Sequence, residues 1–234
     1  MLDYKFLVDT FFVALSGAPI AILITIVSLL IAIPLGFLLA LARLNKVPFL
    51  NRLTQVYISF IRGTPMIVLI FIIYNSAPLI LVSIFAKLNI KTNIYDVNPI
   101  WYAFIVFSLN TIAILSEVFR SALITVNKGQ LEAAQSVGLT NTQAYITIII
   151  PQALVVALPN ICTATTNLIK ATSLGYAMSL QEINLRAKVA ANVGYNYIEA
   201  YIDIFLVYLI LCMAVEYGFK YYEKRLRTYK FANT

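Results

Sequence analysis

Polar and ionisable side chains recur at helical spacing inside two otherwise apolar stretches. The first set steps by three and four residues and consists of Asn110, Ala113, Glu117 and Arg120. The second set has the same spacing and consists of Asn160, Thr163, Asn167 and Lys170. Residues at this spacing share one face of a helix. Because ionisable groups inside a membrane span are costly and usually face a cavity or a partner, we predict that the two stripes line a solute pathway.

The stripes also have a purely structural interpretation. Polar groups often hydrogen-bond across packed helices, and long basic side chains such as Arg120 and Lys170 can extend to a membrane interface. Glu117 and Arg120 could equally form an internal ion pair. A pathway that carries both charge signs would suit a zwitterionic solute, and the sequence leaves these alternatives open.

Few residues in the chain could perform covalent chemistry. There is no histidine, which removes the commonest general base and most transition-metal sites. Cys162 and Cys212 both fall in apolar segments and are expected to be small buried hydrophobes. The chain has no G-x-x-x-x-G-K-[ST] phosphate loop, so we expect neither ATP hydrolysis nor a bound cofactor or metal.

The composition requires a membrane to position these stripes. Of the 234 residues, 61% are hydrophobic and only 12% are charged, with a mean hydropathy of +0.87. Soluble domains are nearer half apolar and a quarter charged. We therefore predict one all-α membrane domain over residues 1–234, with its core at about 15–225 and about five transmembrane helices.

Five apolar segments are candidate spans, at residues 19–42, 55–85, 99–124, 144–169 and 198–219. Prolines mark expected distortions. The first span should kink at Pro34, the second should be interrupted near Pro65 and Pro78, and the fourth at Pro151 and Pro159. Before the first span, residues 2–16 should lie at the membrane interface. Residues 87–98 should lie on the side of the membrane opposite to residues 43–62, and residues 170–196 should be outside or partly re-entrant.

The basic residues predict how the chain is oriented. Eleven of the 17 fall in residues 43–62, residues 120–143 and the tail from residue 220, which the positive-inside rule assigns to the cytoplasm. The N-terminus is then outside and the C-terminus inside, as an odd number of spans requires. The net charge of +7 therefore indicates membrane orientation and no nucleic-acid partner.

Residues 128–151 form a polar insert between two apolar segments. Good helix formers precede Gly138, a residue suited to the end of a helix. Thr140 and Gln143 have the spacing of a capping box that begins a second helix. Ala133 and Ala134 leave a shallow surface that a partner's groove could cover, although a plain connecting helix would have the same pattern.

The same insert resembles the signature loop of ABC importer permeases, EAA–x3–G–x9–I–x–L–P. The matching residues are Glu132, Ala133, Ala134, Gly138, Ile148 and Pro151, with Ile150 where leucine is usual. Four further stretches are similar to the polar amino-acid branch of that family, namely FIRGTP (60–65), EVFR (117–120), PQAL (151–154) and LIKATSL (168–174). In the last of these Ala171 stands where aspartate is common, so a carboxylate beside Lys170 is missing.

The resemblance implies a type I importer permease, multi-pass in the bacterial cell membrane. Two permease subunits, identical or different, would pair with two separate ATPase subunits and an extracytoplasmic solute-binding protein. Glu132, Ala133, Ala134 and Gly138 would form the cytoplasmic coupling helix and its turn, which dock on the ATPase. The permease itself would be a non-catalytic transport subunit.

The expected solute is a polar amino acid. Residues 170–201 are similar to cystine-type permeases, so L-cystine is the first single solute to consider, with arginine, histidine and glutamine also open. The alternative is an ion-coupled secondary transporter or channel in which Glu117 relays a proton or an ion and no ATPase is needed.

Overall fold

The computed structural model describes residues 2–88 and 97–231, and every regular element within them is helical. The α-helices are α1 Tyr4–Leu15, α2 Ala18–Leu44, α3 Pro48–Gly63, α4 Met66–Lys87, α5 Ile100–Thr125, α6 Lys128–Ser136, α7 Asn141–Ala144, α8 Ile150–Ala171, α9 Ile183–Ala191 and α10 Tyr197–Phe231. A π-helical turn, η2 Tyr145–Ile149, precedes α8, and a 3-10 helix, η3 Thr172–Met178, follows it. Most of the predicted polar segment at 87–98 lies outside the described residues.

Five helical segments are long and apolar enough to cross a membrane, which confirms the predicted number of spans. They are Tyr4–Leu44, Met66–Lys87, Ile100–Thr125, Asn141–Met178 and Tyr197–Arg225. The side of the membrane on which each end lies stays a prediction, since the criteria are length and composition only.

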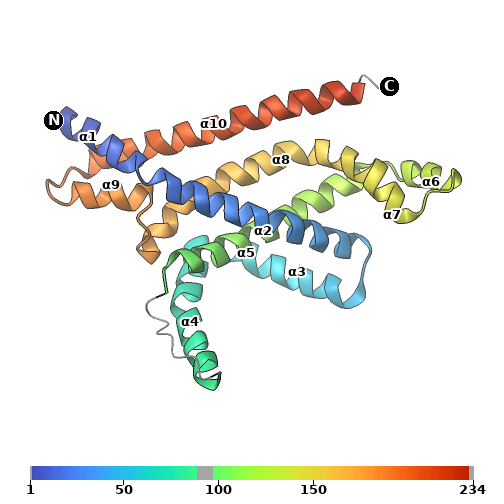
Figure 1. Cartoon of the computed structure of the whole chain (residues 1–234), viewed down its shortest axis with the longest axis horizontal. Helices are drawn as coiled ribbons and strands as arrows, with labels where there is room; N and C mark the ends of the chain where they lie inside the picture. The colour runs from blue at the N-terminus through green and yellow to red at the C-terminus, as the bar shows by residue number, and fades with distance from the viewer. Residues whose placement is uncertain (1, 89–96, 232–234) are drawn as a thin grey trace.

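Helix α5 lies at the centre of the bundle and packs against α2 and α8, while α10 packs along α8 (Figure 1). The window of α5 that could span the membrane is 61% buried, far more than the other four. Ala113, Leu115 and Ser116 on α5 have no exposed surface. Helix α5, which carries the first polar stripe, is therefore the one most enclosed by protein.

The N-terminal segment is a short helix of its own, and its predicted position at the membrane interface stays a prediction. Helix α1 is followed after only two residues by α2, and it packs against α9 and α10. Thr10 and Ala14 are buried in that contact. At the break between α1 and α2, a Cβ added to Gly17 would lie 2.5 Å from the backbone carbon of Glu182, so only glycine allows this close approach.

The predicted second span is two helices. Helix α3 ends at Gly63, and Thr64 is extended, with φ −104° and ψ 130°, which is the conformation that a following proline favours. Helix α4 begins after Pro65 and turns away from the direction shared by α2, α5 and α8 (Figure 1). Residues 55–63 therefore belong to α3, which packs against α2 and α5.

The predicted interruptions at Pro78 and Pro159 are absent, and the predicted kink at Pro34 stays a prediction. Pro34, Pro78 and Pro159 each lie inside a continuous helix. Helices in membranes tolerate proline because neighbouring groups and hydroxyl side chains satisfy the freed backbone. Thr163 illustrates this, since its hydroxyl donates to the carbonyl of Pro159 at 3.1 Å.

Pro151 marks a widened turn. The N–H of Ile150 donates to the carbonyl of Tyr145, five residues back, and closes the π-helical turn η2. In a regular α-helix the ring of Pro151 would clash with the carbonyl four residues earlier, and a wider turn moves that carbonyl away. The polar insert is thus joined to α8 through a π turn.

Candidate functional site

The insert predicted to couple the chain to an ATPase forms a projection at one end of the molecule, beside the end of α2 (Figure 1). Helix α6 begins after Asn127, whose side chain accepts from the N–H of Gly129 at 2.9 Å. Glu132 and Ala133 are exposed on α6, whereas Ala134 is buried. The exposed side of α6 is therefore available to a partner, and the buried side holds it on the bundle.

Ala134 is not part of the exposed surface of α6. It is only 3% exposed, and its carbonyl accepts from Leu139 N–H at 3.1 Å. Its small side chain allows α6 to lie close to its own chain. The coupling role stays a prediction for Glu132, Ala133, Ala134 and Gly138, and Ala134 would contribute to it by holding α6 in place.

The turn after α6 has the geometry that its sequence predicts. Gly138 has φ +86°, the left-handed region that favours glycine. Thr140 and Gln143 form the capping box, with the Gln143 side chain accepting from Thr140 N–H at 2.9 Å. The capping box fixes the start of α7, and one side-chain hydrogen bond, from Gln135 Nε2 of α6 to Asn141 Oδ1 of α7 at 2.7 Å, joins the two helices.

The first polar stripe lies at the contact between α5 and α2. Glu117 forms salt bridges with Arg120 at 2.8 Å and with Arg43 at the end of α2. Ala113 is fully buried, and Asn110 is half-buried. The structural alternative of an internal ion pair is therefore present in the fold, and the pathway role of Asn110, Glu117 and Arg120 stays a prediction.

Sequence reasoning missed Arg43 as a partner in this cluster. It was counted only among the basic residues that orient the chain, because nothing in the sequence indicates which helix α5 packs against. The cluster ties the end of α2 to the end of α5 near the insert.

The second stripe lies on an open face of α8. Asn160, Thr163, Asn167 and Lys170 are all exposed, whereas Ala164, Thr165 and Thr166 are buried. A pocket of about 630 Å³ between the end of α8, α9 and α10 is lined by Lys170, Asn184, Tyr208 and Glu216, among others. The structure thus groups the four predicted residues on one surface, which lies open in the single chain.

Glu182 is a further site residue that the sequence did not indicate. It is completely buried, and its carboxylate accepts from the N–H groups of Asn184 at 2.8 Å and Leu185 at 3.0 Å, which caps α9. Tyr208 of α10 donates its hydroxyl to the same carboxylate at 2.9 Å. Burial raises the pKa of Glu182 to about 7 although these hydrogen bonds and the charge of Lys188 oppose the shift.

With these features described, the chain can be compared with known proteins. Residues 32–228 match the family described as binding-protein-dependent transport system inner membrane component. The chain belongs to this family. The family resemblance inferred from the insert is confirmed, and the permease is a non-catalytic membrane component of a transport system. Membership implies a solute-binding protein and an ATPase as partners, and it does not support the ion-coupled alternative.

Several relatives resemble the permease over most of its length. It is 36% identical to the probable amino-acid permease protein YxeN of Bacillus subtilis, with 90% of the chain and 89% of the relative covered. It is 34% identical to the L-cystine transport system permease protein TcyL of the same organism, with 89% and 85% covered.

Solved structures share the fold. A crystal structure of an amino acid ABC transporter with histidines superposes with a TM-score of 0.80 at 24% identity, covering 96% of the permease and 99% of that chain. An inward-facing structure of the MetNI methionine ABC transporter has a TM-score of 0.69 at 15% identity, with 95% and 97% covered. At these identities the likeness establishes the all-helical permease fold alone.

Proposed function

We propose that the permease carries polar amino acids inward, with L-cystine as the first solute to test, powered by a separate ATPase. The observation that carries this proposal is the similarity to two L-cystine permeases of Bacillus subtilis. TcyL is 34% identical and TcyB is 33% identical, over 89% and 88% of the permease.

The coupling role of α6 is supported by its geometry. Glu132 is an exposed acid on a short projecting helix, and it can pair with a basic residue of the ATPase. The buried side chain of Ala134 and the fixed turn at Gly138 hold α6 so that a push on its exposed side moves α8. ATP-driven movement of the ATPase would then bias a two-state equilibrium of the permease.

A second permease subunit is part of the proposal. The α8 stripe is exposed in the single chain, although Asn160, Asn167 and Lys170 lie on a helix long and apolar enough to span the membrane. Polar groups of this kind are costly against lipid. Pairing with a second permease, identical or different, would turn the stripe toward a shared solute pathway.

The orientation belongs to the same proposal. With α6 on the ATPase side, the N-terminus is outside the cell and the C-terminus inside. Arg43 at the end of α2 and the basic residues in the last turns of α10 then lie on the cytoplasmic side, as the positive-inside rule favours.

The proposal is tested with the complete transporter in proteoliposomes, containing the permease, its ATPase and its solute-binding protein. We expect ATP-dependent uptake of radiolabelled L-cystine, which unlabelled L-cystine suppresses. Uptake of L-glutamine or L-arginine instead would correct the choice of solute, and uptake of no amino acid would contradict the proposed function.

The coupling element is tested with Glu132→Lys in the same preparation. Reversing the charge should lower solute-stimulated ATPase activity and uptake together by about tenfold, since a charge-assisted contact is replaced by repulsion. Lys128→Glu, on the same short helix, is the matched control for a change of surface charge. Unchanged uptake and ATPase docking in Glu132→Lys would show that this residue has no coupling role.

A further inference from the structure

Helix α3 has three distinct faces at helical spacing. One face packs against the bundle and consists of the buried Thr54, Ile58 and Ile61. A second face is apolar and exposed and consists of Phe49, Leu53, Val56 and Phe60. The third face is polar and exposed and consists of Gln55, Ser59 and Arg62. A helix on the surface of a soluble bundle needs only a buried apolar face and an exposed polar face. The exposed apolar face of α3 is therefore the feature to explain.

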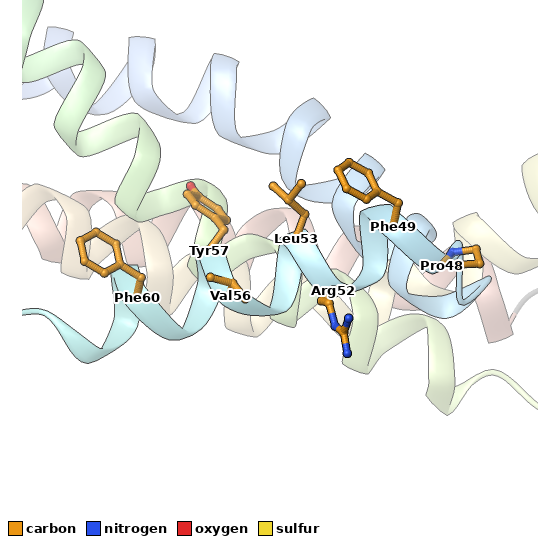
Figure 2. Close-up of a pocket in the computed structure, with 7 residues that line it drawn as sticks. All are labelled: Pro48, Phe49, Arg52, Leu53, Val56, Tyr57 and Phe60. Carbon is orange, nitrogen blue, oxygen red and sulfur yellow. The ribbon is translucent and has the colours of Figure 1, made fainter.

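The apolar face of α3 is suited to lipid. Figure 2 shows Phe49, Leu53 and Phe60 along one side of α3, with the Arg52 side chain pointing away from them. The surface continues onto Leu35, Leu38 and Leu39 of α2, which line an apolar groove together with Leu53 and Tyr57. An exposed apolar surface shared by two adjacent helices indicates that α3 lies within the membrane beside α2.

The depth of α3 follows from two contacts. Gly36 of α2 lies against Leu115 and Ser116 of α5, so Leu109, about two turns earlier in α5, is level with the middle of α2. The hydroxyl of Tyr57 donates to the carbonyl of Leu109 at 2.5 Å. The middle of α3 is therefore level with the middle of the bundle.

With the middle of the bundle placed at the middle of the membrane, Arg62 falls within the hydrocarbon core. It follows Tyr57 by five residues, which is roughly 8 Å further along a helix, whereas half the hydrocarbon core is about 15 Å. The basic pattern of residues 43–62 predicts a cytoplasmic loop leading into a helix, and the structure places Arg62 in the last turn of α3 instead of in a loop. The side of the membrane nearest to Arg62 stays a prediction.

Arg62 is exposed, and its side chain has no hydrogen bond or salt bridge to the side chains described in residues 2–88 and 97–225. The neighbouring Gly63 is also exposed, and a Cβ added to it would meet nothing within 4 Å. A guanidinium at this depth is costly against lipid, and such groups face a wet cavity or a polar partner.

We propose that the polar face of α3 borders the solute pathway and that Arg62 binds the carboxylate of the solute during passage. This inference rests on the proposed amino-acid transport. A guanidinium is permanently charged and presents paired N–H donors that match a carboxylate. Gln55 and Ser59, on the same face, continue a polar surface from Arg62 toward the start of α3.

Water access to Arg62 is tested by cysteine labelling. The two free cysteines, Cys162 and Cys212, are first replaced by serine and alanine. Arg62→Cys and Phe60→Cys are then compared in the complete transporter with an anionic, membrane-impermeant thiol reagent. Because the two positions have the same depth but nearly opposite directions on α3, we expect Arg62→Cys to react at least about tenfold faster. Equal reactivity at the two positions would overturn the proposal.

Carboxylate binding is tested by uptake per ATP hydrolysed. We expect Arg62→Gln to lower this ratio for L-cystine by about tenfold or more, because one charge-assisted hydrogen-bonded contact is lost. Arg62→Lys keeps the positive charge and should give an intermediate ratio. ATPase stimulation by the loaded binding protein should stay unchanged. Arg52→Gln, an exposed arginine two to three turns earlier on α3, should transport as the unaltered permease does.

The outcomes separate this inference from the proposed function. If the unaltered permease moves no amino acid, the proposed function fails and the inference fails with it. If it moves one and Arg62→Gln keeps the same ratio, only the inference is wrong. Loss of ATPase stimulation in Arg62→Gln but not in Arg52→Gln would also overturn the inference, because Arg62 would then act in coupling.

Discussion

Glu117 is the residue whose surroundings most alter its expected role. Its carboxylate is shared between Arg43 and Arg120, and all three side chains are largely covered, with 16–32% of their side-chain surface exposed. Partly buried charges of this kind are costly to leave unpaired. The cluster therefore stabilises the contact between α2 and α5, whether or not solute passes nearby.

Replacing Glu117 by glutamine leaves two basic side chains facing each other without an acid. We expect the free energy of unfolding to fall by about 1.5–3 kcal/mol, the range for hydrogen bonds to charged groups. The thermal midpoint of the purified permease in detergent measures this, with Glu132→Gln as an exposed control. An unchanged midpoint combined with lost uptake would favour the pathway role over the structural one.

Glu182 is the residue whose ionisation should affect stability near neutral pH. Its pKa is raised from the ordinary 4.5 to about 7 in the folded protein by burial. Between these pH values Glu182 binds a proton in the folded state but not in the unfolded state. The contribution of Glu182 to the free energy of unfolding is therefore greatest below about pH 4.5 and is lost as pH rises to about 7. The slope for one such group is at most about 1.4 kcal/mol per pH unit.

Glu182→Gln should remove this part of the pH dependence. Thermal midpoints at pH 5 and pH 7.5 measure it, with Tyr208→Phe as a second variant that deletes the hydroxyl donor. Parallel pH profiles for the unaltered permease and Glu182→Gln would show that Glu182 does not titrate in this window.

At the scale of elements, the turn between α6 and α7 combines a backbone requirement with a proposed function. Gly138 has φ +86°, a conformation that costs most other residues about 1–2 kcal/mol and asparagine less. Position 138 should therefore tolerate asparagine better than a branched side chain.

We expect Gly138→Val to lower coupled uptake several-fold, because it shifts α6 away from its docking angle, and Gly138→Asn to retain most of it. Gly218→Val on α10, where an added Cβ would meet nothing within 4 Å, controls for side-chain volume. Solute-stimulated ATPase activity is the measurement, and equal activity in Gly138→Val and Gly138→Asn would show that this angle is unimportant.

Prolines illustrate what local sequence can decide about an element. Pro65 ends a helix because Gly63 and Thr64 before it allow an extended backbone. Pro34, Pro78 and Pro159 lie inside continuous helices, where the surrounding fold holds the backbone. Proline alone therefore did not distinguish a break from a tolerated interior position.

For the whole molecule, the proposed orientation has a direct test. Epitope tags at the two ends should differ in intact cells, with the N-terminal tag reached by an impermeant antibody and the C-terminal tag reached only after permeabilisation. The physical basis is the retention of basic segments on the cytoplasmic side. Equal accessibility of the two tags would contradict an odd number of spans.

The sequence by itself determined the class of the protein. Apolar composition required a membrane, five long segments gave the spans, and the pattern around Glu132 and Gly138 identified the transport family. These properties are local or additive along the chain. The capping box at Thr140 was predictable for the same reason, since all its partners lie within three residues.

Only the tertiary structure decided which residues meet. Arg43 and Glu117 are 74 residues apart, and Tyr208 and Glu182 are 26 residues apart. Arg62 lies in the last turn of α3, next to the helix break before Pro65. Its level along the bundle follows from the hydrogen bond between Tyr57 of α3 and Leu109 of α5. Depth and partnership depend on how helices pack, and helix packing is set by side chains distant in the sequence.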